Sequence, residues 1–316
     1  MQDELVVRRL YPVKPVYAAG THTVERNSDT STFPILGYDG AAKVVECGEN
    51  VAALRPGDLV VPRKHGLGTW RSAAVVAADD MVAVPSDMDP RFASLLKMVY
   101  TVAYLLATKE AELKPGECII LNAATGRIAQ SVVQFATLAG VRAICVVRDD
   151  KDDASMAHLS KLGAYRVLRE RDVDPAALHA QLPITLAIDS VFGASGARLV
   201  ESLSNNGTYL SLGYLGREQT PAHEFSIPLT EDLLFRRAIK FRNFRLSDRL
   251  RGWSDAELRR LWVWFGELHK EHKLALPALH LIPWSAENCL DAVNATIQHN
   301  AQKLQIHTRP LIFFDQ

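Results

Sequence analysis

Apolar runs alternate with amphipathic stretches along the central part of the chain. Six runs have the length and the β-branched content of buried strands, and stretches of helical periodicity separate several of them. The expected strands cover residues 118–122, 143–148, 165–168, 183–190, 207–212 and 239–246, and the expected helices cover residues 127–139, 152–162 and 255–271. Alternation of this kind is typical of βαβ units, so it predicts an α/β fold with a doubly wound parallel sheet.

The first part of the chain, up to about residue 90, has a different pattern. Short alternating runs rich in Val, Pro and Gly predict strands at residues 42–47, 59–62, 70–77 and 81–85. Strands at this spacing suggest a β-rich, barrel-like unit, and an apolar strand at residues 310–314 is expected to return to it. We therefore expect two domains, residues 1–95 with 275–316 and residues 96–274.

A small-residue turn follows the first strand of the expected parallel sheet. The strand is followed by Asn122, two alanines, Thr125 and Gly126, and a helix is expected to begin at Arg127. A turn of this kind lets a pyrophosphate approach the backbone N–H groups at the helix start. The next strand ends on Arg148, where an Asp or Glu would otherwise bind a ribose 2′-hydroxyl. An arginine there favours the 2′-phosphate of NADPH over a merely solvated side chain.

Arg127 departs from the dinucleotide fingerprint, which requires a glycine at its position. Its guanidinium could form a salt bridge with a phosphate. It could equally fill the space in which the pyrophosphate lies. The sequence leaves these two interpretations open.

Composition narrows the class of protein. The chain has 316 residues, of which 48% are hydrophobic and 23% charged, as in a globular protein with a full core. Lys+Arg and Asp+Glu are balanced at 36 each, so no global charge favours nucleic acid or an acidic membrane. The four cysteines are scattered, and neither they nor the histidines have the spacing of a metal site. No stretch has the length of a membrane span, and no targeting peptide is evident in the sequence as given.

Several short phrases resemble the mitochondrial trans-2-enoyl-thioester reductases of fatty-acid synthesis, in the medium-chain dehydrogenase/reductase superfamily. The most specific is Gly66-Leu67-Gly68-Thr69-Trp70-Arg71. Other matching phrases are Gly37-Tyr38-Asp39-Gly40, Arg55-Pro56-Gly57-Asp58, Leu113-Lys114-Pro115-Gly116, Val146-Val147-Arg148-Asp149 and Leu162-Gly163-Ala164. The resemblance implies medium-chain reductase architecture, with a β-rich GroES-like domain, N-terminally trimmed here, and a doubly wound Rossmann domain.

The resemblance also implies a chemistry. Members of this family reduce the C2=C3 bond of an enoyl group on acyl carrier protein or coenzyme A, with NADPH as cofactor and without zinc. It implies a place near the cofactor for Lys303, a location in the mitochondrial matrix and a homodimer formed through the cofactor domain. The expected cofactor-binding residues are Asn122, Thr125, Gly126, Arg127, Arg148 and Lys303, and no metal ligand is expected.

Other positions depart from the family pattern. The catalytic tyrosine of the family has no match, because no tyrosine occurs between Ala18 and Gly37, and we assign no catalytic residue. Val99 and Val102 stand where the family has Asn and Thr, which removes two hydrogen-bonding side chains from the region that faces cofactor and substrate. A family tryptophan is replaced by Arg245. NADPH is therefore the implied cofactor, but these losses put its retention in question.

Two functions from different classes follow. The departures favour a family member with a degraded active site and little or no activity, which serves as a structural or assembly subunit of a larger mitochondrial complex. The alternative is an active NADPH-dependent enoyl-thioester reductase with a relocated proton donor.

Overall fold

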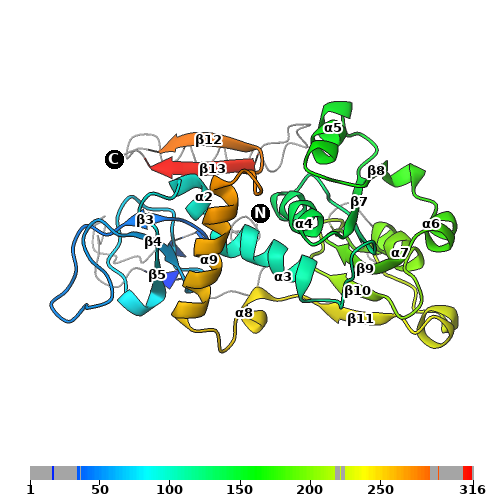
Figure 1. Ribbon diagram of the computed structural model, residues 1–316, viewed down its shortest axis with the longest axis horizontal. Helices are drawn as coiled ribbons and strands as arrows, with labels where there is room; N and C mark the ends of the chain where they lie inside the picture. Colours follow the sequence, from blue (N-terminus) through cyan, green and yellow to red (C-terminus); the bar gives the residue numbers. More distant parts are fainter. Residues whose placement is uncertain are drawn as a thin grey trace.

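The computed structural model describes residues 16–17, 34–35, 37–217, 221, 225–284, 291 and 309–314. A six-stranded parallel sheet with its helices lies beside a smaller strand-rich unit (Figure 1), which confirms the predicted fold class. The domain limits at residues 95 and 275 stay a prediction. The expected N-terminal trimming of the first domain also stays a prediction.

The large sheet has the strand order β11-β10-β9-β6-β7-β8, and every neighbouring pair is parallel. The order reverses between β6 and β9, which start the two halves of the sheet. The central strands have apolar side chains on both faces: Ile119 and Leu121 of β6 lie in one core, and Cys118 and Ile120 lie in the other. The six predicted strands are confirmed as β6 (Cys118–Leu121), β7 (Arg142–Val147), β8 (Arg166–Arg169), β9 (Ile184–Asp189), β10 (Thr208–Ser211) and β11 (Lys240–Asn243). The last is shorter than the predicted 239–246, because a helix begins at Leu246.

Helices connect the strands, as the pattern predicts. The predicted helices are confirmed as α4 (Arg127–Leu138) and α5 (Asp153–Lys161), and two more are present, α6 (Pro175–Gln181) and α7 (Gly193–Glu201). Asp152 and Asp174 cap α5 and α6, because their carboxylates accept hydrogen bonds from backbone N–H groups in the first turns. Neither α4 nor α7 has a side-chain cap, and both begin at the edge where β6 and β9 end.

Among the residues that the structure describes, the strand-rich unit has less strand than predicted. Its antiparallel sheet has the order β3-β4-β5, formed by β3 (Ala42–Lys43), β4 (Leu59–Pro62) and β5 (Met81–Val84). The strand predicted at 42–47 is therefore too long. The one predicted at 70–77 is wrong, because residues 72–75 are exposed there and form no ladder. Two further short ladders are present: β1 (Val16–Tyr17) pairs with β2 (Pro34–Ile35), and β12 (Leu279–Trp284) pairs with β13 (Arg309–Phe314), which confirms the expected last strand.

The chain passes from one unit to the other through three helical segments, α2 (Pro90–Ala93), η2 (Leu96–Thr101) and α3 (Val102–Thr108). Three more helical segments follow β10, which are η4 (Asp232–Arg236), α8 (Leu246–Arg249) and α9 (Asp255–Lys270). Ser254 and Glu257 form a capping box at the start of α9, as the predicted N-cap requires. In Figure 1, α9 lies between the two units, and it contacts both β5 and η2.

Trp262 connects α9 to η2 through burial and a hydrogen bond. Its side chain is fully buried, and its indole Nε1–H donates to Thr101 Oγ1 at 2.9 Å. Thr101 Oγ1 in turn donates to the carbonyl of Leu96 at 2.7 Å. The ring of Phe265, one turn further on, packs against Phe135 of α4. Helix α9 is therefore part of the main core.

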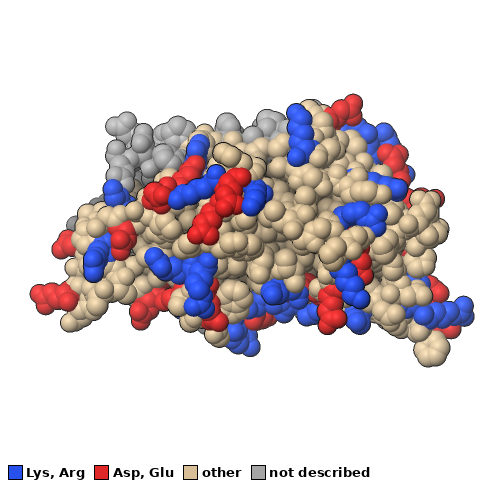
Figure 2. Space-filling model, viewed as in Figure 1, with Lys and Arg blue, Asp and Glu red and all other residues tan. Residues whose placement is uncertain are grey.

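The surface carries no large area of one charge on the face in Figure 2, where blue and red side chains are intermingled over both units. Within the described ranges, no helix has the length and hydropathy that a membrane crossing needs. Cys118 and Cys145 are buried among apolar side chains. Burial raises the pKa of Cys145 to about 12, so this thiol is chemically inert at neutral pH.

Candidate functional site at the edge between β6 and β9

The carboxyl ends of β6 and β9 meet at the point where the strand order reverses. In doubly wound sheets, ligands bind in the crevice outside this point. The loop from Asn122 to Gly126 follows β6, and the loop from Ser190 to Phe192 follows β9. We therefore take these two loops as the candidate site.

The loop after β6 has the shape of a phosphate-binding turn. Ala123 has a φ of 47°, which turns the chain sharply, and Gly126 is the N-cap of α4 with a φ of −71°. The carbonyl of Thr125 accepts a hydrogen bond from the buried Gln130 side chain at 2.8 Å, which fixes the turn from below. No side chain caps the first backbone N–H groups of α4, so this helix end suits an anion.

Asn122 joins the two loops. Its buried carboxamide donates to Asp189 Oδ1 at 2.6 Å and to Ser195 Oγ at 3.0 Å, and its oxygen accepts from the backbone N–H of Ser190 at 2.8 Å. These bonds hold the side chain between the loops. Asn122 is predicted to bind the cofactor. In the structure, its side chain connects the two loops through these hydrogen bonds.

Asp189 is the centre of this network and was not predicted as a site residue. Its carboxylate is 0% exposed and accepts four hydrogen bonds, from Asn122, from the backbone N–H groups of Val191 and Phe192 and from the Tyr209 hydroxyl. Burial, followed by the charge of Asp189, raises the pKa of Tyr209. A sequence signal existed, because an acidic residue that ends an otherwise apolar strand requires partners.

Neighbouring residues extend and restrict the network. Ser195 donates to Glu170 Oε1 at 2.7 Å, so the network reaches the segment that follows β8. Gly196 in α7 passes so close that a β-carbon there would overlap Asp189 Oδ2. Any residue other than glycine at position 196 would therefore force the Asp189 carboxylate to move.

The two arginines predicted to meet the cofactor lie at the first half of the sheet. Arg148 follows β7, is partly exposed, and its Nε lies 3.3 Å from Asp150 Oδ1. Arg127 is the first residue of α4 and is half-buried. The structure thus places both at the carboxyl edge that the dinucleotide crevice requires. Lys303 lies outside the described residues.

Two phrases that carry the family resemblance contact each other. Gly68 N–H donates to the carbonyl of Gly37 at 3.0 Å, and a β-carbon on Gly37, which has a φ of 113°, would overlap Thr69. The loop from Gly66 to Arg71 and the segment from Gly37 to Gly40 therefore fit only with glycine at this contact.

Val99 and Val102 lie at the junction of η2 and α3, and both are buried. Both belong to the main apolar core. Their side chains can neither donate nor accept a hydrogen bond.

A hollow of about 200 Å³ lies where the strand-rich unit meets α8 and α9. Its lining combines Arg63, His65 and Lys97 with Ser247 and the leucines Leu246, Leu250 and Leu258. The buried Lys97 ammonium donates to the carbonyls of Tyr38 at 2.7 Å and Lys64 at 3.0 Å. Arg63 pairs with Asp255. The lining of the hollow therefore combines polar and apolar side chains.

His65 gives this region a pH dependence. Burial, and secondly the charge of Lys97, lowers the pKa of His65 to about 4 from an unfolded value near 6.5. As the pH falls from about 6.5 towards 4, the unfolded chain takes up a proton that the folded protein does not, so the free energy of unfolding falls. We expect His65→Gln to lose less stability than the parent between about pH 7 and about pH 5, measured by urea denaturation. Equal losses in the two proteins would contradict this assignment.

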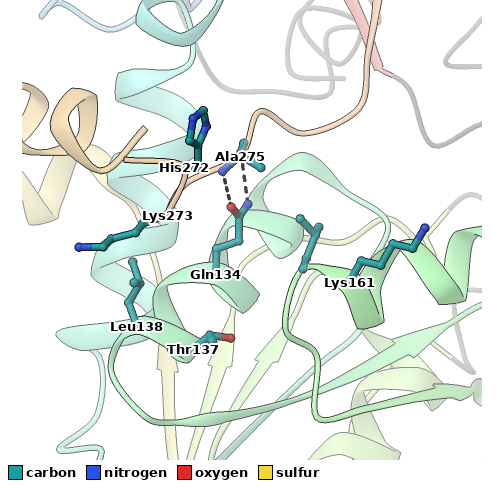
Figure 3. A pocket seen from close by; sticks show the side chains of 8 residues that line it. Gln134, Thr137, Leu138, Lys161, His272, Lys273 and Ala275 are labelled. Carbon is teal, nitrogen blue, oxygen red and sulfur yellow. Dashed lines mark hydrogen bonds between the residues drawn. The ribbon is translucent and has the colours of Figure 1, made fainter. Parts of the chain in front are cut away.

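A second hollow of about 170 Å³ lies between α4, α5 and the chain leaving α9 (Figure 3). Its main feature is a clamp: the Gln134 side chain accepts from the backbone N–H of Ala275 at 2.6 Å and donates to the carbonyl of the same residue at 3.4 Å. The Tyr100 hydroxyl donates to that carbonyl at 3.1 Å. Because Gln134 and Ala275 bond to each other there, this hollow is better explained as a structural joint than as a binding site.

Among the residues that the structure describes, no three His, Cys, Asp or Glu side chains lie close enough to hold a metal ion. The expectation of a zinc-free site stays a prediction.

Comparisons with known proteins place this site in context. No family model matches the chain. The chain is 32% identical over 252 residues to the mitochondrial enoyl-[acyl-carrier-protein] reductase of Homo sapiens, a match that covers 78% of this chain and 66% of that protein. It is 30% identical over 277 residues to the Bos taurus protein of the same name, covering 86% of this chain and 72% of that one.

The fold has a close match among solved structures. The complex of Etr1p with NADP and crotonyl-CoA superimposes with a TM-score of 0.83, over 98% of this chain and 86% of that one, at 22% identity. At this identity the likeness shows the fold. The sequence relatives show the family.

Proposed function

Because the chain belongs to the mitochondrial enoyl-[acyl-carrier-protein] reductase family, we propose that it keeps the reductase fold with little or no reductase activity and serves as a structural or assembly subunit of a larger mitochondrial complex. The chain spans 66% of the length of its human relative, so activity, substrate and partners are part of the proposal.

The observation that carries this proposal is the pair of buried valines, Val99 and Val102. The family resemblance implies Asn and Thr at these positions, in the region that faces cofactor and substrate. Reduction of an enoyl thioester builds negative charge on the thioester oxygen, and stabilising that charge requires hydrogen-bond donors. Valine provides none. The unmatched family tyrosine supports the same conclusion.

The residues at the sheet edge fit NADPH in one half of the crevice. Arg148 and the uncapped start of α4 have the chemistry to hold the phosphates, with Thr125, Gly126 and Arg127 in the turn. When bound, NADPH supplies a hydride. Because Val99 and Val102 offer no hydrogen bond to the reacting groups, we derive no hydride step for this chain.

The alternative is an active NADPH-dependent reductase of enoyl thioesters with a relocated proton donor. One observation favours it: Tyr38 is buried beside the hollow, with its ring 4.6 Å from that of His65. Tyr38 does not have the family's spacing for the catalytic tyrosine. We therefore place this alternative second.

The two functions are separated by following NADPH consumption by the purified protein with short and medium trans-2-enoyl thioesters. We expect no turnover from protein that unfolds cooperatively in urea, which serves as the folding control. Saturable turnover would contradict the proposal, and its loss in Tyr38→Phe would identify the relocated donor.

The relatives are named as mitochondrial proteins, and we propose the mitochondrial matrix as the location of this chain. A structural subunit should co-purify with fixed partners. We expect crosslinking in intact mitochondria to place most of the protein in one large complex. Recovery as a free homodimer would favour the enzyme.

A further inference from the structure

Phe192 has a backbone conformation that side chains rarely adopt. Its φ is 70° and its ψ is −174°, a region that is almost restricted to glycine. Gly193, the next residue, also has a positive φ of 62°. A bulky residue with this geometry is strained, and it persists only where the surroundings hold it.

Asp189 provides that support. Its carboxylate accepts hydrogen bonds from the backbone N–H groups of Val191 and Phe192, both at 2.8 Å. Because the carboxylate is also bonded to Asn122 and Tyr209, it forms a fixed base for the loop. The strained residue is therefore held by the network beneath the crevice.

The ring of Phe192 lies against the loop that follows β10. Its centroid is 5.3 Å from that of Tyr214 and 5.0 Å from that of Phe225. The two loops are also joined through their backbones, because Leu215 and Gly216 donate to the carbonyls of Ser190 at 3.0 Å and Val191 at 2.9 Å. A β-carbon on Gly216 would come within 2.9 Å of the Val191 carbonyl oxygen, which shows how tightly the loops pack.

The position of this cluster determines what it affects. A doubly wound fold binds a dinucleotide across two mononucleotide halves. Arg148 marks the half formed by β6, β7 and β8 as the adenosine side, so the half formed by β9, β10 and β11 is the nicotinamide side. The cluster of Phe192, Tyr214 and Phe225 belongs to this second half.

We propose that Phe192, packed on Tyr214 and Phe225, closes the nicotinamide half of the crevice, so that the site selects the 2′-phosphorylated adenosine part of a dinucleotide and excludes the nicotinamide ring. The inference deepens the proposed function and rests on it.

The test is equilibrium binding by calorimetry of NADP⁺, 2′,5′-ADP and nicotinamide mononucleotide to the full chain. For the parent protein we expect NADP⁺ and 2′,5′-ADP to bind with affinities within about threefold of each other, and no saturable binding of nicotinamide mononucleotide. Phe192→Gly removes both ring and strain, and it should raise the preference for NADP⁺ over 2′,5′-ADP by about tenfold. Phe192→Leu keeps a bulky side chain and is the matched control, with an unchanged preference.

Three results would overturn the inference. These are a preference of about tenfold or more for NADP⁺ in the parent protein, an unchanged preference in Phe192→Gly, or no binding of 2′,5′-ADP to the parent. Arg148→Glu should weaken both nucleotides together, which identifies the adenosine half. A parent that prefers NADP⁺ yet shows no turnover overturns this inference alone. Turnover with enoyl thioesters requires the nicotinamide ring in the site, so it would overturn both the inference and the proposed function.

Discussion

Replacing Asp189 with alanine is expected to lower the free energy of unfolding by about 4 kcal/mol or more, because it leaves four donors without their acceptor. Each buried, unsatisfied donor costs about 1–3 kcal/mol, and water entering the space left by the carboxylate recovers part of the sum. The loss would also free the loop after β9. Urea denaturation followed by tryptophan fluorescence measures the change.

Two matched variants test whether the lost hydrogen bonds cause the destabilisation. Asp189→Asn keeps one carbonyl acceptor in place and should cost clearly less than the alanine variant. Tyr209→Phe removes a single hydrogen bond to the same carboxylate and should cost about 1 kcal/mol. If all three variants lost the same stability, packing volume rather than hydrogen bonding would explain the site.

Trp262→Ala is expected to destabilise the protein by about 4 kcal/mol, because it opens a cavity in the core that joins α9 to η2. The substitution removes the largest fully buried side chain among the described residues and leaves Thr101 without the indole donor. The expected result is a lower midpoint of urea unfolding with little change in the slope.

Trp264, two residues along the same helix, is the control. Its side chain is 40% exposed and lies at the edge of the cluster formed with Tyr104 and Phe265. Trp264→Ala should therefore cost about 1–2 kcal/mol, well below the effect at Trp262. Similar losses at both positions would show that the burial of Trp262 does not determine the size of the effect, since alanine is the better helix former at both.

Most of the parallel sheet could be predicted because burial on both faces leaves a plain signal. A run such as Cys118–Leu121 has no polar residue and can only be a buried segment. The start of α9 could also be predicted, since Ser254 and Glu257 have the spacing of a capping box. These signals are local in sequence.

The strand-rich unit was predicted less well, because alternation alone does not decide whether a ladder partner exists. Residues 70–77 alternate in the manner of a strand, yet Val75 is 89% exposed and Arg71 donates to the carbonyl of Leu67 at 3.2 Å. Contacts of the loop with itself and with the segment around Gly37 replace strand pairing there. Tertiary contacts of this kind cannot be inferred from composition.

The candidate site, too, could be predicted only in part. The turn at Gly126 and the strand end at Arg148 follow from the dinucleotide fingerprint. The roles of Asp189 and Phe192 do not, because they depend on hydrogen bonds between two loops 67 residues apart in sequence and on a backbone angle. A phenylalanine gives no sign in the sequence that its φ is positive.

The Gln134 clamp has a mechanical consequence. Motion between two units requires linker residues that can absorb changes in φ and ψ. The chain leaving α9 cannot do so freely at Ala275, because both backbone groups of that residue are bonded to α4. Tension applied along β12 would therefore reach α4 directly through two parallel hydrogen bonds, and the joint would resist bending until both are broken.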